Sequence, residues 1–420
     1  MYEFCYFMYV FFTQQQPFEM KLHAAFMMTM IRQITFCSVL LLFCCSSDPD
    51  QEEVKPPVTT TDDFLYGADL SYVNQVLDKD GVFKVGGTTK DPYKIFAEKG
   101  TKLTRFRLWH NPSWTKEVYG DDGTQLYNDY QDVEKSITRA RAEGMKILLD
   151  FHYSDTWADP SKQFIPEAWT EITSIEVLKD SVYNYTFKTL KMLNAKGLMP
   201  EFVQLGNESN CGMLYSEAPE GFPNGNGCDG QWSNLGQIIN AGIKAVRDVA
   251  ATSTVKTKII LHVADPKNVD WWFTNITSSA SVTNFDIIGF SYYPLWHTTV
   301  TFNKISDNVA AFKSKFNKDV IILETAYPWT VNGNDGYNNL LGGTPLSGYP
   351  FSEQGQYDFM VALTKEVKDG KGIGVIYWEP AWISSKMKDL WGTGSAWENA
   401  AFFNYNGNAM KAFDYATYKY

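Results

Sequence analysis

The chain is poor in the residues that build soft-metal sites. Its 420 residues include only five histidines and six cysteines. Only Cys211 and Cys228 follow the first 45 residues, and no histidine stands near them at a metal-ligand spacing. This pattern excludes a zinc site built on cysteine pairs. In an oxidising compartment the two thiols would form a disulfide within one loop, and the alternative is two free thiols.

Positive charge is also scarce. The sequence has 37 Lys and Arg against 48 Asp and Glu, a net charge of -11, and it has no basic run. A protein that follows a phosphate backbone needs a Lys/Arg surplus on at least one face, so nucleic acid is excluded as a partner. No glycine-rich phosphate loop follows the first predicted strand, and no repeat of solenoid period is present.

Aromatic residues, in contrast, are abundant. They make up 15% of the chain and include 13 tryptophans. Tryptophan rings at a protein surface suit stacking on sugar rings, although packing in the core accounts for many of them.

A long apolar run, as a membrane-spanning helix requires, is missing as well. The apolar run 34–43 is too short to span a bilayer. It follows Arg32 and precedes Cys44 and Cys45, which predicts an export signal of the lipoprotein type over residues 1–45. Phe43 departs from the small residue usual before a lipid-modified cysteine. We expect translation to start within residues 27–30, at one of the methionines there.

Residues 46–61 are rich in Asp, Glu, Pro and Thr, and they predict a disordered tether. We expect residues 62–420 to form one folded part. We therefore expect an exported protein that is anchored by lipid at the cell surface or outer membrane, with a secreted or periplasmic protein as the alternative. Nothing in the sequence marks a partner surface, so a monomer is expected.

Eight short apolar runs alternate with helix-like stretches through the folded part. Nearly continuous apolar strands are typical of a parallel sheet that is covered by helices. Eight of them favour a single closed (β/α)8 TIM barrel over an open sheet. The predicted strands are 64–70, 102–109, 145–152, 201–205, 258–263, 285–292, 319–324 and 373–378, and the predicted helices include 133–143, 177–193, 235–249, 305–316 and 355–367.

Polar or aromatic residues stand at the C-terminal ends of these runs. In a barrel all of these ends meet on one face, where the active site is built, whereas an open sheet would spread them along an edge. We therefore expect one site at this face. The residues at the strand ends are Asp69, Arg107, Trp109, His152, Asn207, Glu208, His262, Asp265, Tyr292, Tyr293, Glu324, Trp378 and Glu379.

Two of these residues are carboxylates that suit glycoside hydrolysis. Glu208 follows the fourth predicted strand, where partial burial would raise its pKa and let it act as a general acid. Glu324 ends the seventh strand, a costly place for a charge without a task. Across a barrel mouth, the two could reach the spacing of about 5 Å that a retaining double displacement needs. Glu208 could instead cap the following helix.

From about Phe64 to the C-terminus, the chain resembles family 53 of the glycoside hydrolases, the endo-β-1,4-galactanases. The motifs that carry the resemblance are specific in this order, although each alone would be weak. They are GADLS at 67–71, TRFRLW at 104–109, DFHYSDTWADP at 150–160, QLGNE at 204–208, GFSYYP at 289–294, ETAYP at 324–328 and YWEPAW at 377–382.

The resemblance implies a retaining endo-hydrolase of β-1,4-galactan, the side chain of pectin found in type I arabinogalactan. It assigns Glu208 as acid/base and Glu324 as nucleophile. It also implies that Arg107 orients the nucleophile, and that His152 and Tyr292 surround the central sugar. Tyr293 competes with Tyr292 for this role. A structural ion pair is the alternative for Arg107, and a histidine that only packs at the barrel mouth is the alternative for His152.

Several further residues are candidates for sugar binding. Asn207 offers an amide hydrogen to a sugar hydroxyl, and Trp378 is expected beneath the reacting sugar. Asp69 is a weaker candidate at the end of the first strand. The tryptophans that follow strand ends could stack on sugars or pack in loops; they are Trp109, Trp157, Trp296, Trp329 and Trp382.

No cofactor is required by this chemistry. Some bacterial members of the family hold a structural calcium between the loops after the seventh and eighth strands. Here Asn332, Asn334, Asp335 and Asn338 offer oxygen ligands close together, although only one is a carboxylate. An ordinary turn is the alternative reading of this loop.

Two other functions compete with galactan hydrolysis. A barrel glycosidase for xylan, mannan or cellulose would use the same carboxylate chemistry. A non-catalytic, surface-anchored glycan-binding lipoprotein would explain the tryptophans and the anchor, but it needs no glutamates at the ends of two opposite strands.

Overall fold

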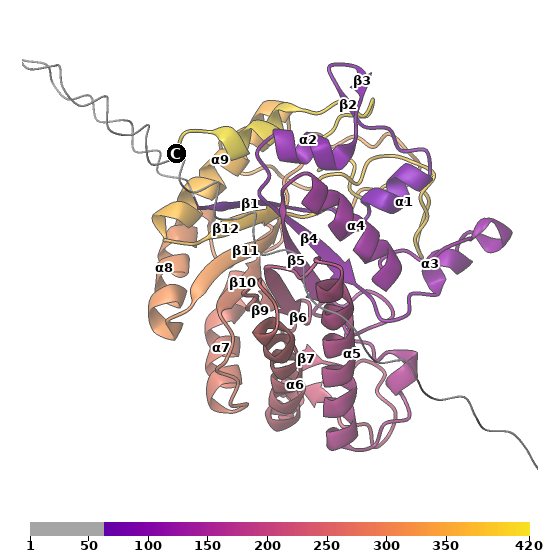
Figure 1. Ribbon diagram of the computed structural model, residues 1–420. Coiled ribbons are helices and arrows are strands. Elements are labelled where there is room, and N and C mark those ends of the chain that lie inside the picture. The colour runs from indigo at the N-terminus through magenta and orange to yellow at the C-terminus, as the bar shows by residue number, and fades with distance from the viewer. Residues whose placement is uncertain (1–62) are drawn as a thin grey trace, which may run out of the picture. The chain divides into compact units, whose positions relative to one another are not determined.

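The computed structural model describes residues 63–420. The predicted leader, residues 1–45, and the predicted tether, residues 46–61, lie outside the described residues. Within the described part, eight parallel strands form a closed barrel in the order β1, β12, β11, β10, β9, β6, β5, β4 (Figure 1). The strands are β1 (Leu65–Asp69), β4 (Leu103–Leu108), β5 (Lys146–Phe151), β6 (Phe202–Leu205), β9 (Lys258–Ala264), β10 (Ile287–Ser291), β11 (Asp319–Thr325) and β12 (Gly374–Tyr377). The predicted (β/α)8 barrel is confirmed, and each predicted strand end is correct to within two residues.

Helices cover the outside of the barrel between successive strands (Figure 1). They are α2 (Pro92–Glu98), α4 (Tyr130–Ala142), α5 (Ile175–Ala195), α6 (Trp232–Ala251), α7 (Val269–Ser278), α8 (Ile305–Phe316) and α9 (Glu353–Asp369). After β12, the 3-10 segment Lys411–Thr417 packs beside α9. The helices predicted above include neither α2 nor α7. The aromatic and β-branched residues of α7 have only moderate helix propensity. Its buried residues Val269, Trp272, Phe273 and Ile276 nevertheless keep helical spacing.

Shorter elements decorate the loops. Helices α1 (Val73–Asp78) and α3 (Trp114–Glu117) follow β1 and β4. There are also two small antiparallel pairs: β2 (Lys84–Val85) with β3 (Thr88–Thr89), and β7 (Gly212–Met213) with β8 (Gly225–Asn226). Further short 3-10 segments lie at Gly120–Asp122, Glu167–Trp169, Gly227–Asp229, Pro266–Asn268 and Phe302–Lys304.

The strands read as continuous apolar runs because both of their faces are buried. One face packs against the helices, and the other fills the barrel interior. The interior cluster draws apolar side chains from all eight strands, and its members are Leu65, Leu103, Leu148, Phe202, Ile260, Ile287, Ile321, Leu323 and Ile376. This packed layer supports the polar residues that stand farther along each strand, toward its C-terminal end.

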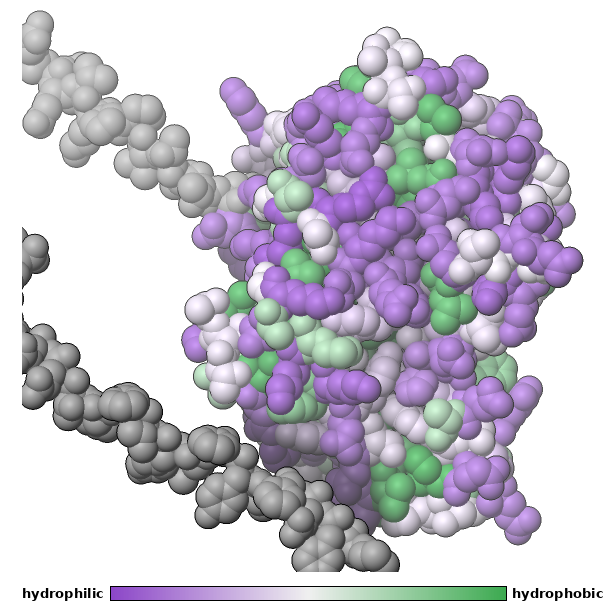
Figure 2. All heavy atoms as spheres, turned by 45° about the vertical axis from the view of Figure 1, so that its right-hand side comes forward, coloured by the Kyte–Doolittle hydropathy of each residue, from purple (hydrophilic) through white to green (hydrophobic). Residues whose placement is uncertain are grey.

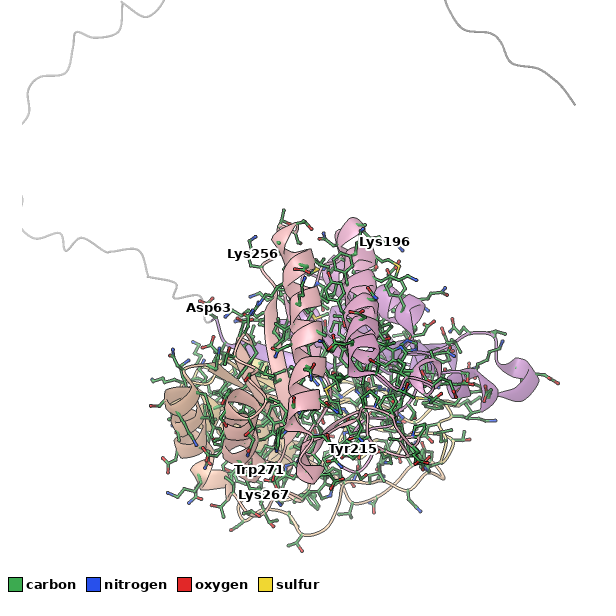
Figure 3. All side chains as sticks on the ribbon, turned by 90° about the horizontal axis from the view of Figure 1, so that it is seen from below. Asp63, Lys196, Tyr215, Lys256, Lys267 and Trp271 are labelled. Atoms are coloured by element: carbon green, nitrogen blue, oxygen red, sulfur yellow. A yellow bond between two sulfur atoms is a disulfide. The ribbon has the colours of Figure 1, made fainter. Side chains whose placement is uncertain are left out.

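The two ends of the barrel differ in what they carry. Lys196 and Lys256, which precede β6 and β9, lie at one end of the long helices in Figure 3. Tyr215 and Lys267, which follow the same two strands, lie at the opposite end (Figure 3). The second end is the C-terminal face, and the candidate site residues are found there.

The face in Figure 2 is mainly hydrophilic, with apolar residues in small separate patches. Among residues 63–420, no helix combines the length and the apolar composition that crossing a bilayer requires.

Candidate active site

Two glutamates face each other at the C-terminal end of the barrel. Glu208 follows β6, and Glu324 lies near the end of β11. A carboxylate oxygen of each lies within 4.8 Å of one of the other, and a ring nitrogen of His262 is within the same distance of both. Glu208 has a φ of +43°, in the left-handed region where a side chain is strained. The close approach of these two predicted carboxylates is compatible with a double displacement.

Arg105 is the hydrogen-bonding centre beneath this pair. It lies on β4, it is 1% exposed, and its Nη1 is 2.8 Å from Oε1 of Glu324. A guanidinium at this distance stabilises the ionised form of the carboxylate. Its remaining N–H groups donate to Asp69 (2.8 Å), Asp150 (2.7 Å), Asn207 (2.7 Å) and Gln204 (3.1 Å). Asp69 and Asn207, both predicted as site residues, therefore help to fix the arginine.

The prediction that Arg107 orients the nucleophile is wrong, because Arg107 pairs with Glu379 instead. Its Nη1 donates to Oε1 of Glu379 at 2.6 Å. Its guanidinium lies over the rings of Tyr72 (4.1 Å) and Trp157 (4.4 Å). Side chains two positions apart on a strand share a face, so both arginines point into the barrel. The alternation does not reveal that Arg107 stands one layer too high to reach Glu324.

The assignment of the central tyrosine also changes. The hydroxyl of Tyr293 donates to Oε2 of Glu324 at 2.9 Å. Tyr292, the residue preferred from the sequence, contributes only its backbone N–H, which donates to the carbonyl of Glu324 at 2.8 Å. A register shift between Phe290 and Ser291 in the pairing of β10 with β11 re-aims the side chains at this strand end. Such an irregularity leaves no mark in the apolar pattern, so the sequence did not reveal it.

The surroundings of the two glutamates give them different proton affinities. Burial raises the pKa of Glu208 well above its ordinary value, and the nearby charge of Glu324 raises it further. Burial also raises the pKa of Glu324, but Arg105 and the Tyr293 hydroxyl act in the opposite direction. Glu208 is therefore the carboxyl that holds a proton, and Glu324 is the one that ionises.

His152 is fixed by hydrogen bonds at both ring nitrogens. Its Nε2 donates to Asp150 at 3.1 Å, while Nδ1 accepts from the Trp109 indole and the Ala158 amide, each at 3.2 Å. Asn207 donates its side-chain N–H to the carbonyl of Ala158 at 2.7 Å. Both residues line the cavity above the carboxylates, and their binding of sugar stays a prediction.

The cavity that contains both glutamates has a volume of about 370 Å³ and is rich in tryptophan. Of the predicted tryptophans, Trp109 and Trp329 do not line it: Trp109 is fully buried, and Trp329 donates its indole N–H to the carbonyl of Glu398. Two lining tryptophans were missed, because they stand far beyond the end of β12 in an irregular segment. The lining tryptophans are Trp157, Trp296, Trp378, Trp382, Trp391 and Trp397.

Comparison with known proteins identifies the family. The model of glycosyl hydrolase family 53 matches residues 65–415. The chain belongs to glycosyl hydrolase family 53. It is therefore a glycoside hydrolase, as predicted.

Named relatives and a solved structure agree with this assignment. An arabinogalactan endo-beta-1,4-galactanase from Cellvibrio japonicus is 42% identical over 83% of this chain and 89% of its own length. An endo-beta-1,4-galactanase from Bacillus subtilis is 32% identical over 84% of this chain and 86% of its own. The family 53 catalytic domain from Ignisphaera aggregans superposes with a TM-score of 0.74 at 32% identity, covering 86% of this chain and 98% of that domain.

The two cysteines of the family 53 domain form a disulfide, Cys211–Cys228. This confirms the first of the two alternatives drawn from the sequence. The bridge closes the segment after β6 that contains the β7–β8 pair. It therefore restrains the loop that begins directly after Glu208.

The predicted calcium loop meets the segment that follows β12. The backbone amides of Asn334 and Asp335 donate to Oε1 of Glu398. The side-chain Nδ2 of Asn334 donates to Oγ of Ser384 at 3.0 Å. Burial raises the pKa of Glu398, and the charge of Asp335 adds to this. Two neighbouring carboxylates with amide and hydroxyl oxygens are hard donors that suit calcium. Of the four predicted residues, Asn334 and Asp335 contact Glu398 or Ser384, whereas the side chains of Asn332 and Asn338 make no hydrogen bond to this group within residues 63–420.

Proposed function

We propose that this family 53 enzyme is a retaining endo-hydrolase of β-1,4-linked galactan, such as pectic galactan and type I arabinogalactan. The observation that carries the proposal is the close pair of a half-buried Glu208 and a buried Glu324, of which only Glu324 forms an ion pair with Arg105 among the described residues. The named relatives support galactan as the substrate, because both act on β-1,4-galactan by their names.

The first chemical step forms a bond from Glu324 to the substrate. The ionised carboxylate attacks the anomeric carbon of the sugar, and the bond from that carbon to the glycosidic oxygen breaks. Protonated Glu208 gives its proton to the leaving oxygen. Arg105 and the Tyr293 hydroxyl hold Glu324 ionised and aimed before the attack.

The second step releases the sugar. Glu208, now ionised, takes a proton from water, and the water oxygen attacks the anomeric carbon. The bond to Glu324 breaks, and both carboxyls return to their starting states. Two displacements on opposite faces retain the anomeric configuration.

The tryptophan-lined cavity supports a sugar substrate. Trp378 directly follows β12 at the barrel mouth. Its ring packs edge to face with that of Trp397, with ring centroids 4.7 Å apart. Such rigid apolar faces bind the C–H faces of sugar rings while the polar groups beside them bind hydroxyls.

The test is hydrolysis of linear β-1,4-galactan by residues 62–420, beside xylan, mannan and cellulose. We expect a rapid loss of galactan viscosity, as endo cleavage gives, and little release from the other polymers. The Glu324→Gln variant should be inactive, and Asp265→Asn, another carboxylate at a strand end, serves as the matched control. Cleavage of another polymer in preference to galactan would favour the competing glycosidase, and binding without cleavage would favour the glycan-binding protein.

We propose further that the chain is exported and lipid-anchored as a monomer. The disulfide supports export, because such bonds persist in oxidising compartments. Radiolabelled palmitate in the full-length chain, absent from a variant with Cys44 and Cys45 replaced by alanine, would support the anchor. A protein found only in the medium would contradict it.

We also propose a structural calcium held by Asp335, Glu398, Asn334 and Ser384. It would neutralise the two carboxylates and join the loops after β11 and β12. Thermal unfolding with calcium and with a chelator tests this site. A midpoint that is the same in both conditions would contradict the proposal.

A further inference from the structure

A ring of three hydrogen bonds begins and ends at Glu208. Its backbone N–H donates to Nδ1 of His262 at 3.3 Å, and Nε2 of the same ring lies 2.9 Å from Oγ of Ser291. The Ser291 hydroxyl then donates to Oε1 of Glu208 at 2.6 Å. Ser291 is 0% exposed and His262 is 1% exposed, so water does not replace these partners.

The direction of each bond in the ring follows from the backbone. An amide N–H is always a donor, so Nδ1 of His262 must accept from Glu208. Burial lowers the pKa of His262 well below its ordinary value, and the charge of Arg105 lowers it further. The neutral ring therefore carries its hydrogen on Nε2 and donates it to Ser291.

The side-chain amide of Asn207 also lies beside the His262 ring. Oδ1 of Asn207 lies 3.0 Å from Nδ1, where two acceptors would repel each other. This oxygen also accepts from Nη2 of Arg105 at 2.7 Å, and the charged donor holds it in place. The opposite tautomer, with the hydrogen on Nδ1, would satisfy Asn207 but would reverse the remaining two bonds of the ring.

We infer that Ser291 and His262 decide which oxygen of Glu208 carries the catalytic proton. Oε1 accepts permanently from Ser291, so only Oε2 gives a proton to the leaving oxygen and later takes one from water. The inference rests on the proposed role of Glu208 and deepens it. Ser291 and His262 are positioning residues, because they act through Glu208 and exchange no proton with the substrate.

Other charged groups near Glu208 also shift its pKa, and they are unchanged in the variants of Ser291 and His262 described below. Glu324 and Asp159 raise the pKa of Glu208, whereas Ser291 and Arg105 lower it. Asp69 and Asp150 raise the pKa of Glu324. His262 and Tyr293 are further ionisable side chains beside the two carboxylates.

The experiment measures the pH profile of kcat/KM on linear galactan for the parent and for Ser291→Ala. The upper limb reports the group that must be protonated, which is Glu208. Without the Ser291 hydroxyl the ionised carboxyl loses a donor, so we expect this limb to move up by about one pH unit. The neutral-pH kcat/KM should fall about tenfold as the carboxyl loses its fixed orientation.

Two variants keep this test decisive. Ser291→Thr retains the hydroxyl and should return the upper limb to its parental position. His262→Asn is too short to reach Ser291, and it should move the limb in the same direction by less. Thermal unfolding of every variant separates loss of fold from loss of the hydrogen bond, and if Ser291→Ala does not fold, His262→Asn decides the test.

The outcomes separate the inference from the proposed function. An upper limb that does not move in folded Ser291→Ala overturns the inference. A limb that moves to lower pH also overturns it, because Glu208 would then donate to Ser291 in the reversed ring. Full galactan hydrolysis by Glu208→Gln would instead remove the proposed role of Glu208 itself.

Discussion

Arg105 and Arg107 are the same residue type on the same face of β4, yet they serve different parts of the site. The guanidinium of Arg105 donates to the carboxylate oxygens of Asp69 and Asp150 and pairs with Glu324. Among the described residues, Glu379 is the one acidic partner of Arg107, and the Nε and Nη2 groups of Arg107 have no hydrogen-bond partner. It packs instead between aromatic rings.

The different contacts of Arg105 and Arg107 show that the position of a residue along a barrel strand determines its role in the site. The deeper arginine forms ion pairs with Asp69, Asp150 and Glu324, so it controls charge. The arginine nearer the mouth stands level with Tyr72 and Trp157, so it supports the aromatic wall. Each role predicts a different kinetic defect, and the defects rank by their distance from the reacting atoms.

The largest effect is expected for Arg105→Lys. Lysine keeps the charge but not the planar fork that reaches Glu324, Asp69 and Asp150 together. We expect kcat on linear galactan to fall at least about 100-fold, since Glu324, the proposed nucleophile, loses its charge-assisted partner. Steady-state kinetics at the pH optimum measure this loss. A decrease of less than tenfold in a folded protein would contradict the role of Arg105.

A smaller loss is expected for Tyr293→Phe. It removes one hydrogen bond to a charged carboxylate, which corresponds to a decrease of about 10- to 100-fold in kcat. Tyr292→Phe is the matched control, because the hydroxyl of Tyr292 does not contact Glu324. Equal defects in the two variants would show that the tyrosines act through packing alone.

Arg107→Lys should affect binding more than chemistry. Loss of stacking on Tyr72 and Trp157 loosens the cavity wall, so we expect KM for galactan to rise about fivefold. The kcat should change less than about threefold, because no reacting group loses a partner. If kcat falls as far as it does in Arg105→Lys, the two arginines do not divide the work as described.

The smallest effect is a change in pH-dependent stability that arises from Glu379. Burial raises its pKa from 4.5 to about 8, although Arg107 opposes the shift. A raised carboxyl pKa gives stability that is complete below 4.5 and is lost as the pH rises through about 8. Glu379→Gln lacks this titration. The difference between the Tm of the variant and the Tm of the parent should therefore increase in favour of the variant as the pH rises from 5 to 8. Parallel Tm curves for the two proteins would contradict this origin of the pH dependence.

The sequence was informative where the physics is periodic. Apolar runs and their polar ends predicted the barrel, its catalytic face, and Glu208 and Glu324 as the carboxyl pair. It failed where geometry depends on layer and register: Arg107 was chosen over Arg105, and Tyr292 over Tyr293. Both errors are shifts by one or two residues along a strand, and a register shift such as that at Phe290 and Ser291 has no sequence signature.

Site residues outside the periodic elements were also not predicted from the sequence. Trp391 and Trp397 line the cavity from an irregular segment, where no period ties a residue to a position. Ser291 ends a strand as an ordinary small residue, so only its contacts with Glu208 and His262 mark it.

Glu324 is the proposed nucleophile of a retaining double displacement. The most direct test of this role is to trap the covalent intermediate with a 2-deoxy-2-fluoro-β-galactobioside that carries a dinitrophenyl leaving group, and to map the labelled peptide by mass spectrometry. We expect one label per chain, on Glu324, together with loss of galactan hydrolysis. A label on Glu208 or Glu379, or active enzyme without any label, would contradict the account.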